Sequence, residues 1–90
     1  KYRFKDLRPQ IADSAYIAPD AVVIGDAIIK EEASIWFKTV IRADINSIEV
    51  GHQSNIQDTC ILHVTREYPV LVGDRVTVGH GVTLHGCTVE

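Results

Sequence analysis

Three of the four histidines in this 90-residue chain, His63, His80 and His85, fall within one short stretch. Imidazole nitrogens bind zinc well, and three imidazoles with one open coordination position form the arrangement typical of hydrolytic zinc sites. The same donors also suit iron and cobalt, so Zn²⁺ is the first candidate ion and Fe²⁺ or Co²⁺ are alternatives. His52 lies in another face without such partners, and we interpret it as a surface residue.

The elements that must position these histidines follow a six-residue repeat. Aliphatic residues recur every six positions over 11–41, over 50–62 and over 72–84, and a mostly small residue follows each of them four positions later, with Ile45 at one of these small positions. This period does not match a helix of about 3.6 residues per turn, and it is typical of a solenoid of short strands and bends. The aliphatic side chains should point into a narrow core.

Three repeats per coil give about four stacked coils, and this stacking predicts which side chains lie above one another. One predicted column contains Ile24, Arg42, His63 and His85. Strands of neighbouring coils lie about 4.8 Å apart, so the two imidazoles should lie about 5 Å apart. Asp58 should lie one coil from His80, on the preceding face. A bend separates His80 from His85, so a homotrimer in which His80 meets the other two histidines of the next chain would complete the site.

Further polar residues that suit such a site lie in segment 41–67. Arg42 and Asp44 can face one side of a strand and bridge two chains, or they can form a solvated ion pair that contributes little. Gln57, with Asn55, can orient a reacting water, although solenoids also use amide ladders at coil edges. Glu67 lies in the inserted loop 64–71 and can serve either as a proton shuttle or as an ordinary exposed carboxylate.

Composition narrows the possible partners. The net charge is −3 and the nine basic residues are dispersed, so nothing in the composition indicates a nucleic-acid footprint. No stretch approaches the roughly 20 apolar residues of a membrane span, and no signal-peptide pattern starts the chain. Two cysteines do not indicate a disulfide-stabilised secreted protein. We therefore expect a cytoplasmic protein with neither a nucleic-acid nor a membrane partner.

We interpret residues 1–90 as a single β-helix domain, with repeats over 11–89. Segment 1–10 precedes the repeats and is expected to cap the first coil through Tyr2, Phe4 and Leu7. The other end shows no cap, so further C-terminal coils and a cap helix are expected beyond it. Trp36 and Phe37 lie on the face that later carries His80, and outward aromatic residues there favour a buried contact with another chain over simple shielding of the coil edge.

The segments I-R-A-D at 41–44, N-I-Q-D at 55–58 and V-G-H-G-V-T-L-H-G-C at 78–87, together with His63, resemble the gamma-class carbonic anhydrases and their hexapeptide-repeat relatives. The resemblance implies a left-handed parallel β-helix and a homotrimer that hydrates CO2 reversibly to bicarbonate through a metal-bound hydroxide. The implied roles are metal ligands for His63, His80 and His85, active-site amides for Gln57 and Asn55, an intersubunit ion pair for Arg42 and Asp44, and a supporting carboxylate for Asp58.

The chain also departs from the founding type of that family. Ile45 stands where a glutamate follows the Arg-x-Asp motif, and the loop after His63 is short, so Glu67 is only an approximate substitute for the shuttle glutamate. The chain resembles the short-loop subgroup, in which hydratase activity is not assured. Two alternatives stay open: an acyltransferase or thioesterase on the same scaffold, and a metal-binding assembly subunit without turnover.

Overall fold

The structure is a computed structural model that describes residues 7–90. The described residues form short strands joined by tight bends, and none of them is helical. The strands are β1 (Gln10–Ile11), β2 (Tyr16–Ile17), β3 (Val22–Ile29), β4 (Ser34–Ile35), β5 (Val40–Val50), β6 (Asn55–Ile56), β7 (Ile61–His63), β8 (Val70–Val72), β9 (Thr77–Val78), β10 (Thr83–His85) and β11 (Thr88–Val89).

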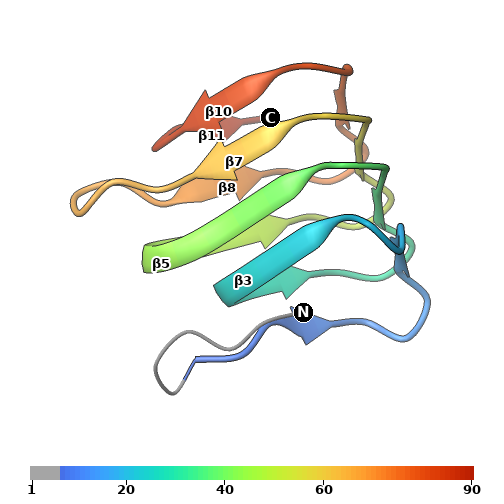
Figure 1. Ribbon diagram of the computed structural model, residues 1–90, viewed down its shortest axis with the longest axis horizontal. Helices are drawn as coiled ribbons and strands as arrows, with labels where there is room; N and C mark the ends of the chain where they lie inside the picture. The colour runs from blue at the N-terminus through green and yellow to red at the C-terminus, as the bar shows by residue number, and fades with distance from the viewer. Residues whose placement is uncertain (1–6) are drawn as a thin grey trace.

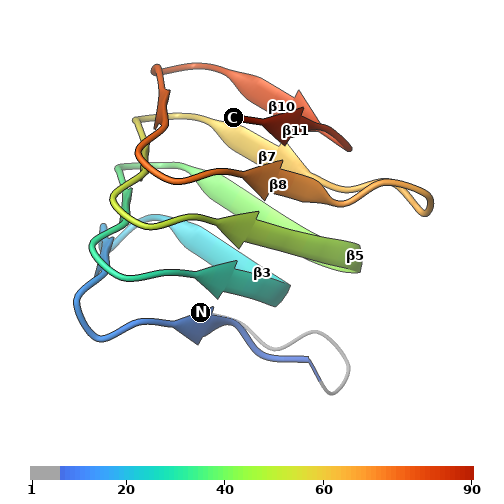
Figure 2. The same ribbon diagram turned by 180° about the vertical axis from the view of Figure 1, so that it is seen from behind.

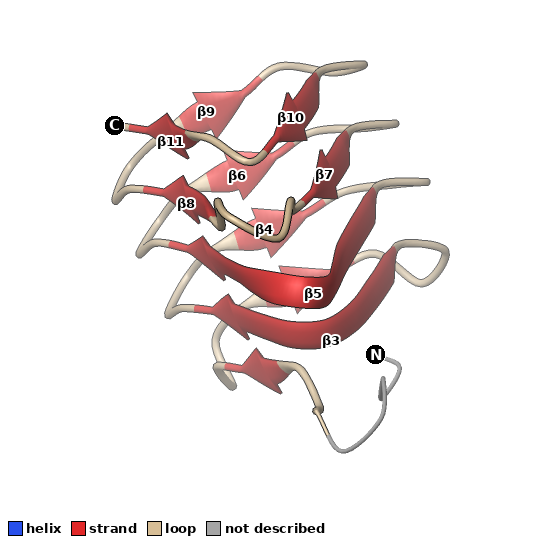
Figure 3. Ribbon diagram, turned by 90° about the vertical axis from the view of Figure 1, so that its left-hand side faces the viewer, coloured by secondary structure: helices blue, strands red, loops and turns tan. Residues whose placement is uncertain are grey.

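Every strand pairs in parallel with strands of the neighbouring coils. One face stacks β2, β4, β6 and β9, while β1, β3, β5, β7 and β10 follow one another along the larger sheet, and β8 pairs with both β5 and β11. The coils rise from one end of the molecule to the other, as the blue-to-red order in Figure 1 and its reverse view in Figure 2 show. Figure 3 shows the stacked strands of the separate faces. The parallel β-helix expected from the six-residue repeat is confirmed.

The core consists of three aliphatic ladders at the predicted repeat positions, and Val89 adds one residue that the repeat did not predict. The first contains Ile11, Ile29, Val50, Val72 and Val89, the second Ile17, Ile35, Ile56 and Val78, and the third Val23, Ile41, Leu62 and Leu84. The ladder residues of the middle coils are almost completely buried. Because no coil can bury its own apolar side chains alone, each coil depends on the coils above and below it.

The extra residues after Ile41 form a bulge at a corner. β3 and β5 pair with an offset of 18 residues up to Gly25 and Ala43, and with an offset of 21 from Ala27 and Ile48 onward. Ile48 is fully buried, whereas Ile45 is 53% exposed. The expectation that Ile45 takes the small-residue position four residues after Ile41 was therefore wrong, because the bulge turns Ile45 outward and Ile48 joins the column of Ala27.

The second insertion is a loop that projects beside the stack between β7 and β8 (Figure 1). It occupies residues 64–69, two residues fewer than expected, because Val70 and Leu71 already pair with Ile48 and Glu49 of β5. The loop closes on itself: the Thr65 N–H donates to the Tyr68 carbonyl at 3.0 Å, and the Tyr68 N–H donates to Thr65 Oγ1 at 2.9 Å.

The turns that follow β4, β6 and β9 carry residues of the candidate site described below. Lys38, Thr59 and Gly81 adopt left-handed φ angles of 60°, 59° and 71° in successive coils. The N–H of Thr59 donates to the carbonyl of Phe37, and that of Gly81 donates to Asp58, both at 2.9 Å. The predicted placement of Asp58 one coil from His80 is confirmed, since each residue immediately precedes the left-handed position of its turn.

The expected N-terminal cap is only partly visible. Tyr2 and Phe4 lie outside the described residues. Leu7 is 43% exposed and lines a surface pocket with Asp44 and Ile45, so it does not bury its side chain in the first coil. No helix among residues 7–90 is long and apolar enough to cross a membrane.

Candidate metal centre

His63 and His85 lie directly above one another on β7 and β10. The register pairs Arg42 with His63 and His63 with His85, as the column predicted. The two imidazole rings are stacked, with centroids 5.3 Å apart and planes inclined by only 7°. The expected separation of about 5 Å is confirmed, and it follows from the spacing of parallel strands. Two of the three predicted ligands are therefore brought together by backbone pairing.

Arg42 and Asp44 hold His63 from both sides of its ring. Arg42 Nη2 lies 3.3 Å from His63 Nδ1, and Asp44 Oδ1 lies 3.2 Å from His63 Nε2. A guanidinium can only donate hydrogen bonds, so Nδ1 must accept and Nε2 must carry the proton that it donates to Asp44. Arg42 Nε also lies 3.5 Å from Asp44 Oδ2. The two residues thus form an ion pair within one chain around His63, and a pairing across chains stays a prediction.

The charge state of Asp44 follows from these contacts. Partial burial acts to raise the pKa of this carboxyl, but the hydrogen bond from His63, a backbone N–H and the nearby positive charge of Arg42 together outweigh it. The pKa of Asp44 therefore lies below its ordinary value. A carboxylate beside a ring N–H is the partner that fixes the tautomer of a metal-binding histidine in many metalloproteins.

The described residues supply part of the donor set that a metal ion needs. Among residues 7–90, no three histidine, cysteine or acidic side chains converge closely enough to hold an ion. His63 and His85 supply two imidazoles in register, while His80 follows β9 at the corner before β10. A three-imidazole site needs one of the ring nitrogens of His63 released from Arg42 or Asp44, and a third imidazole from outside the chain.

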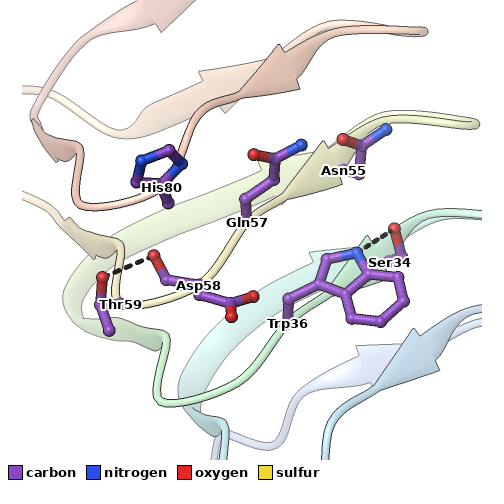
Figure 4. Close-up of a pocket in the computed structure, with 7 residues that line it drawn as sticks. All are labelled: Ser34, Trp36, Asn55, Gln57, Asp58, Thr59 and His80. Atoms are coloured by element: carbon purple, nitrogen blue, oxygen red, sulfur yellow. Dashed lines mark hydrogen bonds between the residues drawn. The ribbon is translucent and has the colours of Figure 1, made fainter.

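His80 lines a separate pocket of about 580 Å³ on the neighbouring face (Figure 4). The residues around this pocket are Ser34, Trp36, Asn55, Gln57, Asp58, Thr59 and His80. Asn55, Gln57 and Asp58, three of the polar residues singled out from the sequence, thus lie with His80 rather than with His63 and His85. The pocket combines two amides, one carboxylate and one imidazole.

Thr39 supports this pocket and was not predicted as a functional residue. Its hydroxyl is completely buried and donates to the backbone carbonyl of Gln57 at 2.7 Å, while the N–H of Gln57 donates to Val78 at 3.0 Å. The main chain of Gln57 is therefore fixed from both neighbouring coils. The sequence did contain a signal, because Thr39 occupies a repeat position that alanine fills in the preceding coils.

Of the remaining candidates, Glu67 and His52 lie outside both clusters, whereas Trp36 lines the pocket beside His80. Glu67 is exposed in the loop between β7 and β8. His52 is a surface residue as expected, and its Nδ1 lies 3.1 Å from Glu31 Oε1. Trp36 does lie on the face that carries His80, where it packs against Tyr16 and Phe37 of its own chain.

The stacked six-residue repeats are those of a hexapeptide-repeat protein. Two stacked histidines and a third at the next corner give this protein a candidate metal site. No family model matches the chain. A protein from Geobacillus kaustophilus named carbonic anhydrase is 49% identical over 89 residues, which are 99% of this chain and 49% of that protein. Gamma carbonic anhydrase 1 of Arabidopsis thaliana mitochondria is 44% identical over 91 aligned residues, covering 94% of this chain and 33% of that protein.

Solved structures with the same fold indicate the same family. The crystal structure of a putative acetyltransferase from Bacillus cereus superposes with a TM-score of 0.97 at 46% identity, over 99% of this chain and 52% of that one. The chain belongs to the hexapeptide-repeat family that includes the gamma-class carbonic anhydrases. It spans about half the length of the Geobacillus relative.

Proposed function

We propose that this chain carries the metal site of a carbonic anhydrase that converts CO2 reversibly to bicarbonate, and that the site forms between the subunits of a homotrimer. The observation that carries the proposal is the stacking of His63 and His85 at 5.3 Å, with His80 displayed at the adjacent corner. The identity of 44% and 49% to two relatives named carbonic anhydrase supports it. Zinc is the expected ion, with iron or cobalt as alternatives.

The residues of this chain would have two roles, metal binding and orientation of the reacting molecules. His63 and His85 would hold the ion from one subunit and His80 from the next, and a divalent ion held this way makes water a nucleophile at neutral pH. Gln57 and Asn55 would orient the attacking water and the CO2 by hydrogen bonds. Asp58 would support His80 from the coil beneath it.

Proton release would be the weak step of this cycle. The hydration reaction liberates one proton per CO2, and this proton must reach buffer. Glu67 is the candidate shuttle, and it lies exposed in the loop that follows His63. Ile45, which stands where the founding type has a glutamate, cannot carry a proton. We therefore expect turnover to rise with buffer concentration, and Glu67→Gln to lower turnover most at low buffer.

The experiment that tests the proposal measures metal content and stopped-flow CO2 hydration of the wild type, His85→Ala and His52→Ala. His85→Ala should lose both metal and hydration. His52→Ala should keep both, because His52 is a surface residue away from the site. Stoichiometric metal without hydration in the wild type would reject the enzyme and favour the metal-binding assembly subunit. A metal-free protein would reject the site.

An acyl-transfer or thioester-processing enzyme is the second candidate. It is supported by the similarity to the Bacillus cereus structure described as a putative acetyltransferase and by the pocket beside His80. In that reading His80 acts as a general base and no metal is needed. Saturable binding of acetyl-CoA by metal-free protein, lost in His80→Ala, would select this candidate.

A further inference from the structure

The pocket beside His80 has one aromatic wall, formed by Trp36. The indole N–H is the only polar group of that side chain, and it donates to Ser34 Oγ at 2.9 Å. Figure 4 shows the indole on one side of the pocket, with Gln57 and His80 on the other. Because its single donor is already used by Ser34, Trp36 offers the pocket only its apolar ring surface.

This wall is held rigidly by the coil beneath it. The register places Tyr16 of β2 directly below Ser34 of β4. The ring of Tyr16 lies 4.9 Å from the indole at an angle of 46°, and the ring of Phe37 lies at 6.1 Å on another side. Tilted aromatic pairs at these distances attract one another, so the indole is fixed before any ligand arrives.

We propose that Trp36 is a specificity-determining residue that contacts the substrate, and that Ser34 and Tyr16 are its positioning residues. A pocket with an aromatic surface on one side and amides and an imidazole on the other fits a small planar molecule with apolar faces and polar edges. Linear CO2 and planar bicarbonate have this chemistry: the carbon lies against the indole, and the oxygens reach the side-chain amides of Gln57 and Asn55, one coil above Trp36. The inference rests on the proposed function, whose substrate it places in this pocket.

The kinetic test compares Trp36→Ala, which removes the wall, with Trp36→Phe, which keeps an aromatic surface without the indole N–H. Trp36→Ala should raise the KM for CO2 about fivefold, the change that corresponds to one aromatic contact, without loss of bound metal. Trp36→Phe should have a KM for CO2 close to the wild-type value. Tyr68→Ala removes an exposed aromatic residue of the loop at 64–69 and serves as the matched control. An unchanged KM in Trp36→Ala, in a protein that hydrates CO2, would overturn the inference and leave the proposed function standing.

A second measurement does not depend on turnover. Trp36 is the only tryptophan of the chain, so its fluorescence reports on this wall alone. Titration of the metal-loaded wild type with sodium bicarbonate should change the emission saturably, whereas sodium chloride at equal ionic strength should not. Gln57→Ala should weaken the bicarbonate response. No saturable response to bicarbonate would overturn the inference, and a response to acetyl-CoA alone would overturn the substrate class. A wild-type protein that shows no CO2 hydration in a separate stopped-flow assay would count against the proposed function.

Discussion

Leu62→Ala and Leu71→Ala form a matched pair that tests the register around His63. Leu62 is fully buried between Ile41 and Leu84 in the third ladder, whereas Leu71 is 38% exposed on β8. Burial of a leucine side chain contributes about 2 kcal/mol. The cavity left in a stack that cannot collapse adds about 1 to 2 kcal/mol. Leu62→Ala should therefore lower the free energy of unfolding by about 3 to 4 kcal/mol, and Leu71→Ala by about 1 kcal/mol.

Urea unfolding followed by circular dichroism measures both values. The midpoint should fall much further for Leu62→Ala than for Leu71→Ala, with the same m value in both variants, because the surface exposed on unfolding is unchanged. Equal losses, or a larger loss for Leu71→Ala, would refute the register. A shift of one residue would turn Leu62 outward and would move His63 into the core.

Three other predictions concern the pocket, a corner and a surface pair. Thr39→Val should cost about 1 to 3 kcal/mol in urea unfolding, because it leaves the Gln57 carbonyl unpaired, and a loss too small to measure would contradict this. Gly25→Ala should lower the melting temperature sharply, since its φ is +80° and a Cβ there would overlap the next strand; an unchanged melting temperature would contradict this. The hydrogen bond and charge of Glu49 raise the pKa of Lys30 above 10.5, so this pair stabilises the fold below that pH and less as pH rises through the folded pKa. The difference in melting temperature between wild type and Glu49→Gln should therefore shrink in strong alkali, and a constant difference would contradict it.

The ladders and the histidine column could be predicted because a six-residue period translates directly into position. Once the period is known, backbone pairing alone places His63 above Arg42 and below His85. The bulge could not be predicted, because an insertion of three residues can be absorbed anywhere between two ladder positions. Only the packing decides that Ile48, and not Ile45, enters the core.

The side-chain contacts around His63 also could not be predicted from the sequence. Arg42 and Asp44 contact the two ring nitrogens of His63 in their own chain, while their pairing across chains stays a prediction. Such contacts depend on side-chain rotamers, which no repeat pattern specifies. Under the proposed function, metal uptake would need to displace one of these contacts, and pairing across subunits would provide the replacement.

The central claim, a metal site shared between subunits, is tested most directly by mixing two inactive variants. His80→Ala and His85→Ala chains are unfolded, combined in equal amounts, refolded with zinc and assayed by stopped-flow CO2 hydration. A site that takes His63 and His85 from one chain and His80 from another is intact in about one quarter of random pairings, so the mixture should regain about a quarter of wild-type activity. No recovery in a mixture that assembles and binds zinc as the wild type does would contradict the shared site.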